Sequence, residues 1–524
     1  MIIHYKNQLI ERWLVSVNLI TASLVAATFV SLYGFDEPLI SAKVLHTIQI
    51  AAFVIFLLEK VIRLFNAVSK REYLRANWFE VPFFVFFFIG FLGADHWFFY
   101  NAPETGRMFA VGVYLVVQVV AKACQGTVNL AASGENPTKA LIGIFLALIA
   151  IGASLLCLPK SYVSEPTSPV DALFTATSAT CVTGLVVQDT GTHFSLMGQI
   201  VILSLIQLGG LGIVTFGAVL ALLLGQALSV KESVAMKDLL SAHTLGKIGN
   251  IIGFIFVTTI LFEVLGAIGL MEMWSYSADV AGETRQEWFY SIFHSISAFC
   301  NAGFGLYSDS LERFNDSWQV YGVIGTLIIL GGLGFGVLYN LFSVMMDILK
   351  RTAGRIKHRK GVLQGEVPMK ISLQSKIVLV TSLLLILAGT GIFLILENNA
   401  GSEFNGESGT LDRFLAAFFQ SVTARTAGFN TVDISSMSPA SKVVLMILMF
   451  IGGSPGSTAG GIKTVTFAVI LLVGYATMRK RSEVEVFKRS ISIAVVGRAV
   501  TVAMIFVFIF FAVSFALSIT ERQN

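Results

Sequence analysis

Three short stretches of the chain have small, hydroxyl-bearing and apolar residues in a similar order before a glycine. An aspartate follows each glycine. They read TSATCVTGL, ISAFCNAGF and SVTARTAGF, and their glycines are Gly184, Gly303 and Gly428. The glycines recur at a spacing of about 120 residues, and a diglycine follows each of them further along the chain, which indicates an internal repeat.

The chemistry that these stretches predict is the binding of a bare cation by backbone oxygens. A column of carbonyls can replace the hydration shell of an ion. Carbonyls that face one way demand backbone angles closed to residues with a Cβ, which explains the glycines. The expected filter residues are Val182, Thr183, Gly184, Asn301, Ala302, Gly303, Thr426, Ala427 and Gly428.

An aspartate five or six residues beyond each glycine puts negative charge at the expected outer mouth, where it concentrates cations. These aspartates are Asp189, Asp309 and Asp433. Two further aspartates, Asp171 and Asp412, stand where the short helices before the glycines should begin, and we expect them to be N-caps.

A second glycine-rich stretch, GGSPGSTAGG, lies inside the apolar segment that follows the third repeat glycine. Five glycines and a proline in ten residues should break that helix within the membrane and leave a flexible plug. The plug residues are Gly452, Gly453, Ser454, Pro455, Gly456, Ser457, Thr458, Ala459, Gly460 and Gly461. Lys463, just after them, either presents a cation near the conduction path, or it snorkels or pairs with a carboxylate; both interpretations stay open.

The elements that must position these residues are membrane-spanning helices. Of the 524 residues 55% are hydrophobic and 13% charged, and mean hydropathy is +0.78, whereas soluble domains carry roughly 25% charged residues. Apolar stretches of about 20 residues can span the hydrocarbon core. Eleven such stretches occur, at 13–33, 44–66, 78–100, 107–131, 139–159, 197–225, 249–271, 318–347, 374–396, 440–475 and 492–519.

The charges between these stretches predict the topology. Residues 350–376 hold eight basic residues against Glu366, whereas 272–287 and 397–413 are mainly acidic. Since basic connections stay in the cytoplasm, the alternation predicts a multi-pass protein of the inner (plasma) membrane with a cytoplasmic N-terminus. The seven histidines are scattered and show no nucleophile–base or metal-ligand spacing, so we expect no enzyme, no nucleic-acid partner and no bound cofactor.

The motifs together resemble those of the Trk/Ktr/HKT superfamily of potassium transporters, and of its KtrB/TrkH-like pore subunits in particular. The stretches that carry the resemblance are those around the three glycines and FIGGSPGSTAGGIKT (450–464). The resemblance implies four repeats of helix, pore helix and helix around one pore. It assigns Gly184, Gly303 and Gly428 to the selectivity filter, K+ to the transported ion with Na+ as the second candidate, and 452–461 with Lys463 to an intramembrane gate loop. Gly184 stands where sodium-transporting plant members have serine, which favours K+.

The same resemblance implies partners. It predicts a homodimer in the lipid bilayer that sits on cytosolic nucleotide-binding regulatory subunits of the KtrA/TrkA type. The basic segment 350–360 is a plausible dock for such subunits or for anionic lipid.

The predicted fold is an all-α integral membrane protein in two parts. Residues 1–135 form a four-span bundle, and 136–524 form the ion-translocating domain. Residues 56–65 and 71–84 weakly resemble the S1–S4 module of voltage-gated channels. The span 107–131 supplies only Arg107 and Lys122, too few for a voltage sensor, so we expect a packing or regulatory role. The ion-translocating domain divides into repeats 139–225, 249–347 and 374–475 and a first helix of a fourth repeat, 492–519.

A fourth filter glycine is expected about 120 residues beyond Gly428, past Asn524. This leads to a second hypothesis, in which the chain is a non-conducting fragment or a regulatory membrane partner of complete pores.

Overall fold

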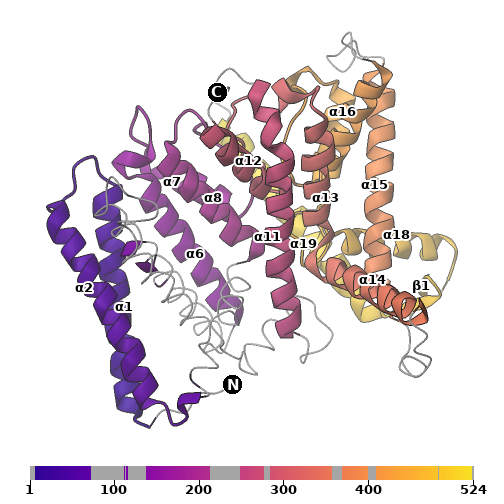
Figure 1. Cartoon of the computed structure of the whole chain (residues 1–524). Helices are drawn as coiled ribbons and strands as arrows, with labels where there is room; N and C mark the ends of the chain where they lie inside the picture. The colour runs from indigo at the N-terminus through magenta and orange to yellow at the C-terminus, as the bar shows by residue number, and fades with distance from the viewer. Residues whose placement is uncertain are drawn as a thin grey trace. The chain divides into compact units, whose positions relative to one another are not determined.

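A computed structural model describes residues 6–71, 73, 111–112, 114–115, 118, 137–212, 248–276, 284–356, 369–398, 409–481 and 483–521. The predicted span 78–100, most of 107–131, the end of 197–225 and the predicted boundary at 135/136 lie outside these ranges. The described chain is almost entirely helical (Figure 1).

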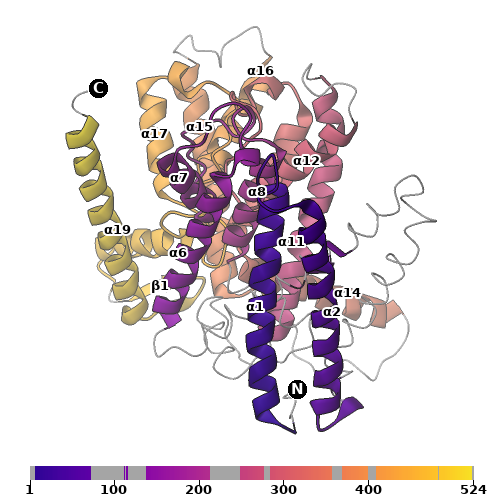
Figure 2. The same cartoon turned by 90° about the vertical axis from the view of Figure 1, so that its left-hand side faces the viewer.

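The first compact unit comprises Met1–Thr180 and Val186–Val257. Its N-terminal part is a helical hairpin of α1 (Gln8–Tyr33) and α2 (Ala42–Asn66), which run side by side along their length (Figure 2). Its second part packs α6 (Pro137–Leu156) against α7 (Pro169–Thr180) and α8 (Leu196–Leu211), with a short turn η1 (Pro159–Ser161) beside α8.

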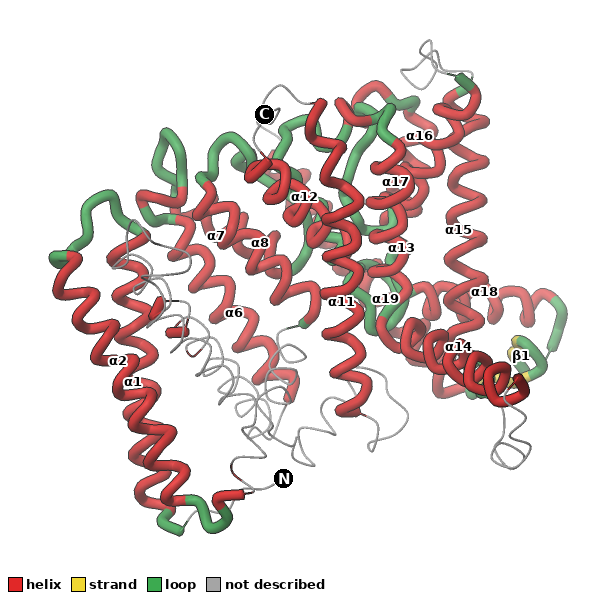
Figure 3. Tube along the Cα trace, viewed as in Figure 1, coloured by secondary structure: helices red, strands yellow, loops and turns green. Residues whose placement is uncertain are grey.

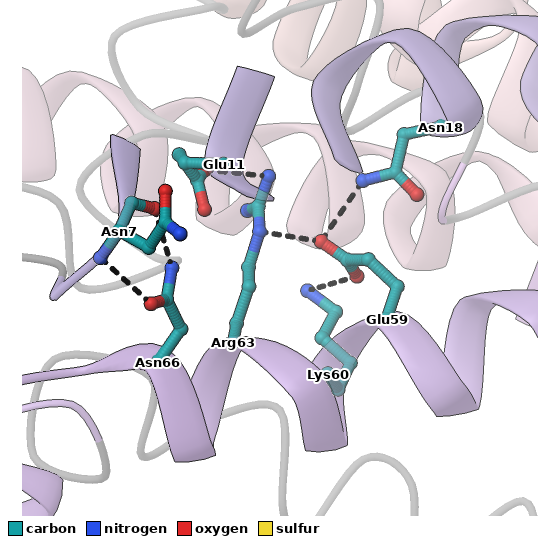
Figure 4. A network of polar contacts seen from close by, with 7 residues as sticks. All are labelled: Asn7, Glu11, Asn18, Glu59, Lys60, Arg63 and Asn66. Carbon is teal, nitrogen blue, oxygen red and sulfur yellow. Dashed lines mark hydrogen bonds and ion pairs between the residues drawn. The ribbon is translucent and has the colours of Figure 1, made fainter. Parts of the chain in front are cut away.

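A buried charged network closes the α1–α2 hairpin at the end where the chain begins (Figure 4). Arg63 donates to Glu59 at 2.7 Å on its own helix and to Glu11 of α1 at 2.9 Å. Asn18 of α1 donates to Glu59 at 2.9 Å, and the Glu59 side chain is only 1% exposed. Because buried charges must be paired, these contacts set the register of the two helices.

The second compact unit comprises Cys181–Leu185 and Thr258–Asn524. Its helices pack chiefly around α15, which contacts α16, α17 and α18, and around α13, which contacts α12 and α16. The helices are α11 (Ile248–Leu270, which begins in the first unit), η3 (Met271–Tyr276), α12 (Thr284–Phe299), η4 (Glu312–Phe314), η5 (Val320–Ile324), α13 (Gly325–Leu333), α14 (Phe335–Ile356), α15 (Leu373–Glu397), α16 (Thr410–Thr423), η7 (Ile434–Ser436), α17 (Pro439–Phe450), α18 (Thr464–Met478) and α19 (Ile493–Thr520).

The predicted continuous helix over 318–347 is wrong, because the chain bends by 98° between α13 and α14 (Figure 3). Gly334 forms the corner with a φ of +84°, a left-handed angle that glycine adopts without strain. The diglycine Gly331-Gly332 therefore lies in the last turn of α13 and not inside a long helix.

The predicted segment 440–475 is also two helices, as its glycines and proline indicate. α17 ends at Phe450 and α18 begins at Thr464, and the chain between them is not helical. We call residues 452–463, which include the predicted gate loop, the intramembrane loop; its depth in a membrane stays a prediction.

One feature was not expected in an all-α fold. Strands β1 (Val484–Val486) and β2 (Arg489–Ile491) form an antiparallel hairpin. Its two turn residues, Phe487 and Lys488, both have positive φ. This is the pattern of a type I′ turn, whose backbone matches the right-handed twist of the two strands.

By length and apolar composition, four described helices can cross a membrane, at Leu9–Tyr33, Ile251–Trp274, Leu373–Glu397 and Ile493–Thr520, and the bent α13–α14 pair can count as a fifth. Large apolar side chains cover their outer surfaces, for example Phe508 and Phe515 of α19. Exposed apolar surface of this extent is stable only against lipid or another protein. The prediction of a helical membrane protein is confirmed; the eleven spans and the repeat layout stay predictions.

Candidate functional site

The predicted filter residues share one unusual backbone geometry. They form three segments of three residues each, 182–184, 301–303 and 426–428, which we call the filter segments. The last residue of each segment is the repeat glycine, with φ of +82° at Gly184, +72° at Gly303 and +82° at Gly428. The first residue is also left-handed, with φ of 56°, 55° and 67° at Val182, Asn301 and Thr426, whereas the middle residue is not.

This alternation has a direct consequence for the carbonyl groups. In an ordinary strand successive carbonyls face opposite sides. When φ alternates between positive and negative, successive peptide planes turn so that their carbonyl oxygens face the same side. The segments thus have the backbone angles that the expected filter requires, and their binding of a cation stays a prediction. The sequence did not reveal that Val182 and Thr426, both β-branched, take left-handed angles, which costs about 1–3 kcal/mol each.

The three glycines also lie where the filter segments approach one another. A Cβ on Gly184 would stand 2.4 Å from the carbonyl oxygen of Ala302, and one on Gly303 would stand 2.8 Å from that of Ala427. A Cβ on Gly428 would stand 3.1 Å from the Cα of Gly303. The first segment is therefore next to the second, and the second is next to the third, without side chains between them.

Hydroxyl groups of the short helices hold the second and third segments from behind. Ser297 of α12 donates to the carbonyl of Phe304 at 2.7 Å. Thr423 of α16 donates to the carbonyl of Phe429 at 2.7 Å and accepts from its N–H at 3.0 Å. Neither residue was predicted from the sequence to belong to the site. The signal that could have found them is a hydroxyl inside an otherwise apolar stretch, five or six positions before a repeat glycine.

A buried histidine holds the chain just beyond the second segment. His294 of α12 accepts from the N–H of Leu306 through Nε2 at 3.3 Å, and its Nδ1 donates to the carbonyl of Tyr290 at 2.8 Å. The ring packs on Trp274, with centroids 4.6 Å apart. Because Nε2 accepts a hydrogen bond here, the imidazole is neutral, with its proton on Nδ1.

The two expected N-caps, Asp171 and Asp412, are instead third residues of their helices. Gly409 precedes α16, and its N–H donates to the Asp412 carboxylate at 3.0 Å. Ser168 precedes α7 and accepts from the N–H of Asp171 at 3.1 Å. The Asp412 carboxylate thus reaches back to the start of its helix, whereas the Asp171 carboxylate accepts from the side chain of Gln188 at 3.3 Å.

The intramembrane loop supplies hydrogen-bond donors to the end of α13. Ser454 donates its N–H to the carbonyl of Gly332 at 2.9 Å, and its hydroxyl donates to the carbonyl of Leu333. Beyond the corner, Phe335 donates its N–H to the carbonyl of Gly456 at 3.0 Å. The last carbonyls of a helix lack partners within it, and here the broken helix of the next repeat provides them.

The loop also contacts two of the filter segments through side chains. The Asn301 amide lies 2.8 Å from the Thr458 hydroxyl, within hydrogen-bond distance in either orientation of the amide. Thr458 also donates to the carbonyl of Phe299 at 3.1 Å. Gly460 donates its N–H to the hydroxyl of Thr426 at 3.0 Å. The predicted gate loop and predicted filter residues are thus brought together by direct contacts.

Lys463 turns back on the loop. Its ammonium donates to the carbonyl of Ala459 at 2.7 Å. In the described part of the chain it forms no ion pair with a carboxylate. Since the Ala459 carbonyl and the Gly460 N–H belong to one peptide group, this group joins Lys463 on one side to Thr426 on the other.

The three aspartates of the predicted outer mouth each have a local structural partner. Asp189 accepts from the N–H groups of Gly191 and Thr192 at 3.0 and 2.8 Å. Asp309 forms an ion pair with Arg313 at 2.8 Å, which offsets its charge. Their attraction of cations stays a prediction.

Asp433, the third of these aspartates, precedes η7. Its carboxylate accepts from the hydroxyl of Ser435 and from the Ser435 N–H, the latter at 2.8 Å. These hydrogen bonds hold the pKa of Asp433 below its ordinary value of 3.8. The carboxylate is therefore ionised over the whole neutral range and into mild acid.

The groups around the filter segments affect a cation in opposite ways: two helix ends favour it, and one buried guanidinium repels it. α12 and α16 end at Phe299 and Thr423, just before their filter segments. The carboxyl end of a helix carries partial negative charge and favours cations. Arg425 places a buried guanidinium beside the third segment, and its Nε has no hydrogen-bond partner among the described residues. Within the described ranges no cluster of three or more His, Cys, Asp or Glu side chains could hold a metal ion. The backbone oxygens of the filter segments stay the candidate cation ligands that the sequence predicts.

Comparison with known protein families and sequences gives three matches. The family model described as cation transport protein, TrkH, matches residues 115–524. The chain is 39% identical over 391 residues to the Ktr system potassium uptake protein B of Bacillus subtilis, covering 74% of this chain and 80% of that protein. It is 35% identical over 387 residues to the potassium/sodium uptake protein NtpJ of Enterococcus hirae, covering 74% and 80%.

The fold has a counterpart among solved structures. The potassium transporter TrkH from Vibrio parahaemolyticus superposes with a TM-score of 0.54 at 19% identity, covering 86% of this chain and 84% of that one. With the family match over most of the chain, these relatives show that the protein belongs to the TrkH family of cation transport proteins.

Proposed function

We propose that this protein carries K+ across the cell inner membrane through a filter built from residues 182–184, 301–303 and 426–428. The observation that carries the proposal is the alternation of left- and right-handed backbone in all three segments. Such alternation favours carbonyl oxygens that face one side, and such oxygens can replace the hydration shell of a cation. The strain at Val182, Asn301 and Thr426 supports a functional role, because strained residues cluster at ligand sites.

Potassium is the favoured ion for two reasons. The first filter glycine position holds Gly184 and not the serine of sodium-transporting plant members. The relative that is 39% identical is named a potassium uptake protein. The name of the Enterococcus relative includes sodium, so Na+ is the second ion to test. We further propose that the intramembrane loop is the gate, since a non-helical segment at membrane depth must line water or be buried in protein.

The arrangement in the cell follows from the charges and the resemblance. We propose a cytoplasmic N-terminus, because the basic connections should face the cytoplasm. We also propose a homodimer that binds cytosolic regulatory subunits of the KtrA/TrkA type. The basic end of α14 supports this, although Arg351 there is already paired with Asp347 at 2.8 Å. Copurification of a candidate regulatory subunit with and without substitution of Lys350 and Arg355 tests this part.

The main test is growth of a bacterium that lacks its own potassium uptake systems, at limiting K+. Expression of the full-length protein should restore growth, and membrane vesicles that contain it should take up K+ faster than Na+. A protein that inserts normally but transports neither ion would contradict the proposal. That result would favour the alternative, a non-conducting regulatory membrane partner.

A further inference from the structure

The contacts between the intramembrane loop and the filter segments fall on particular residues. In the second segment the loop reaches Asn301 through Thr458, and in the third it reaches Thr426 through the N–H of Gly460. Asn301 and Thr426 are the first residues of their segments, and both are non-glycine residues with positive φ. The loop therefore contacts the strained residues of two filter segments.

Strain of this kind persists only where the surroundings hold it. A left-handed backbone costs about 1–3 kcal/mol at a residue other than glycine, and Thr426 is β-branched, which makes the angle still less favourable. Ser297 and Thr423 hold the far ends of the same segments, at Phe304 and Phe429. On the near side, the loop contacts Asn301 through Thr458 and Thr426 through the Gly460 N–H. In its flipped orientation the Asn301 amide also bonds to the backbone of α13 at Ile328 and Gly332.

The loop is itself held in the position that makes these contacts. Ser454 bonds to the end of α13, and Thr458 bonds to the end of α12 through the carbonyl of Phe299. Lys463 holds the Ala459 carbonyl, and so fixes the peptide whose N–H reaches Thr426. Three separate anchors thus orient the two groups that touch the filter.

From these contacts we infer that Thr458, Gly460 and Lys463 position the filter as well as the gate, so that ion selectivity depends on the loop. This rests on the proposed function of the two parts. When the loop is in place, Asn301 and Thr426 keep the left-handed angles that aim their carbonyls at the ion. When the loop leaves, these residues relax and the filter discriminates less between K+ and Na+. A gate that acted only by blocking the path would change the total flux and leave this discrimination unchanged.

The experiment compares isosteric substitutions in the full-length protein reconstituted in vesicles. Thr458→Val and Thr426→Val each remove one hydroxyl and keep the side-chain shape. Thr458→Ser and Thr426→Ser keep the hydroxyl and remove a methyl group. Thr464→Val is the matched control, because the Thr464 hydroxyl lies one residue beyond the loop, is buried and has no hydrogen-bond partner among the described residues.

We expect both valine variants of the contact residues to lower the ratio of K+ to Na+ uptake by about three- to tenfold, the effect of losing one hydrogen bond. The serine variants and Thr464→Val should keep the ratio of the unsubstituted protein. Lys463→Met should lower the ratio in the same direction, since it releases the peptide without altering a filter residue. Valine variants that raise the total flux but keep the ratio would overturn the inference.

A second measurement does not require transport. Ions that bind the filter should raise the thermal unfolding temperature of the detergent-solubilised protein. K+ should stabilise the unsubstituted protein more than Na+ does, and this difference should shrink in Thr458→Val and Thr426→Val but not in Thr464→Val. An unchanged difference in the two contact variants contradicts the inference. Failure of the unsubstituted protein to take up K+ contradicts the proposed function instead.

Discussion

Thr423 and Phe429 close a ring of two hydrogen bonds behind the third filter glycine. The Thr423 hydroxyl accepts from the Phe429 N–H at 3.0 Å and donates to the carbonyl of the same residue at 2.7 Å. Both side chains are buried. One side chain of the pore helix α16 therefore satisfies the backbone donor and acceptor of the residue that follows Gly428.

Replacing this hydroxyl should weaken the third filter segment. Thr423→Val leaves the buried N–H and carbonyl of Phe429 without partners, which should cost about 1–3 kcal/mol of stability and raise the K+ concentration for half-maximal uptake. Thr423→Ser should restore both quantities. The control is Thr390→Val, because Thr390 is also buried and, within the described ranges, its hydroxyl bonds to the carbonyl of Ile386 in its own helix. Equal effects at Thr423 and Thr390 would show that the ring has no special role.

The three filter glycines should differ in their tolerance of a side chain. The nearest atoms to an added Cβ lie at 2.4 Å for Gly184, 2.8 Å for Gly303 and 3.1 Å for Gly428. We therefore expect loss of K+ uptake in the order Gly184→Ala, Gly303→Ala, Gly428→Ala, with the first the most severe. Gly474→Ala in α18, where nothing lies within 4 Å, should retain full uptake. Gly184→Ser, where it still supports uptake, should shift selection towards Na+; unchanged selection would argue against Gly184 as a filter residue.

The charged network of the N-terminal hairpin should be essential for its stability. Arg63→Met leaves the buried Glu59 carboxylate without its closest cation, and breaking a buried pair costs about 3–5 kcal/mol. The double variant Glu59→Gln/Arg63→Met should recover part of the loss. Lys60→Met is the control, because Lys60 lies 4.0 Å from Glu59 and is more exposed. The thermal unfolding temperature in detergent gives the stability of all three variants. An Arg63→Met variant as stable as Lys60→Met would contradict the prediction.

Acid should weaken the loop that follows the third filter segment. The Ser435 hydrogen bonds hold the pKa of Asp433 below its ordinary value of 3.8, so the folded chain binds this proton less readily than the unfolded chain does. The stabilisation is complete above the unfolded pKa and is lost as the pH falls through the folded pKa. The unfolding temperature of the natural protein should exceed that of Asp433→Asn at neutral pH.

This difference should shrink as the pH is lowered to about 3. Ser435→Ala should reproduce part of the effect, because it removes one of the two donors from Ser435 and leaves the backbone N–H. A difference between Asp433→Asn and the natural protein that stays constant from neutral pH to acid would rule out this role for the carboxylate.

Much of the site could be predicted from the sequence because its signals are local. The composition predicted a membrane protein, the recurrent glycines marked the three segments with left-handed backbone, and GGSPGSTAGG marked the break between α17 and α18. Each of these follows from the properties of single residues: apolar side chains leave water, and glycine and proline interrupt helices and permit left-handed angles.

Other parts of the site could not be read from the chain, because they depend on residues far apart in sequence. Asn301 and Thr458 are 157 positions apart, and no spacing rule connects them. The left-handed angles of Val182 and Thr426 run against the preference of their residue types, so only surrounding contacts can impose them. The bend at Gly334 is stable because the loop provides hydrogen bonds to the end of α13.

The sequence by itself thus determined that the chain is a helical membrane protein and where glycines permit a left-handed backbone. The tertiary structure decided which segments hold those carbonyls in place. The physical reason is that a residue's intrinsic preferences act over a few neighbours along the chain, whereas the hydrogen bonds that hold a strained backbone form only after distant helices have packed.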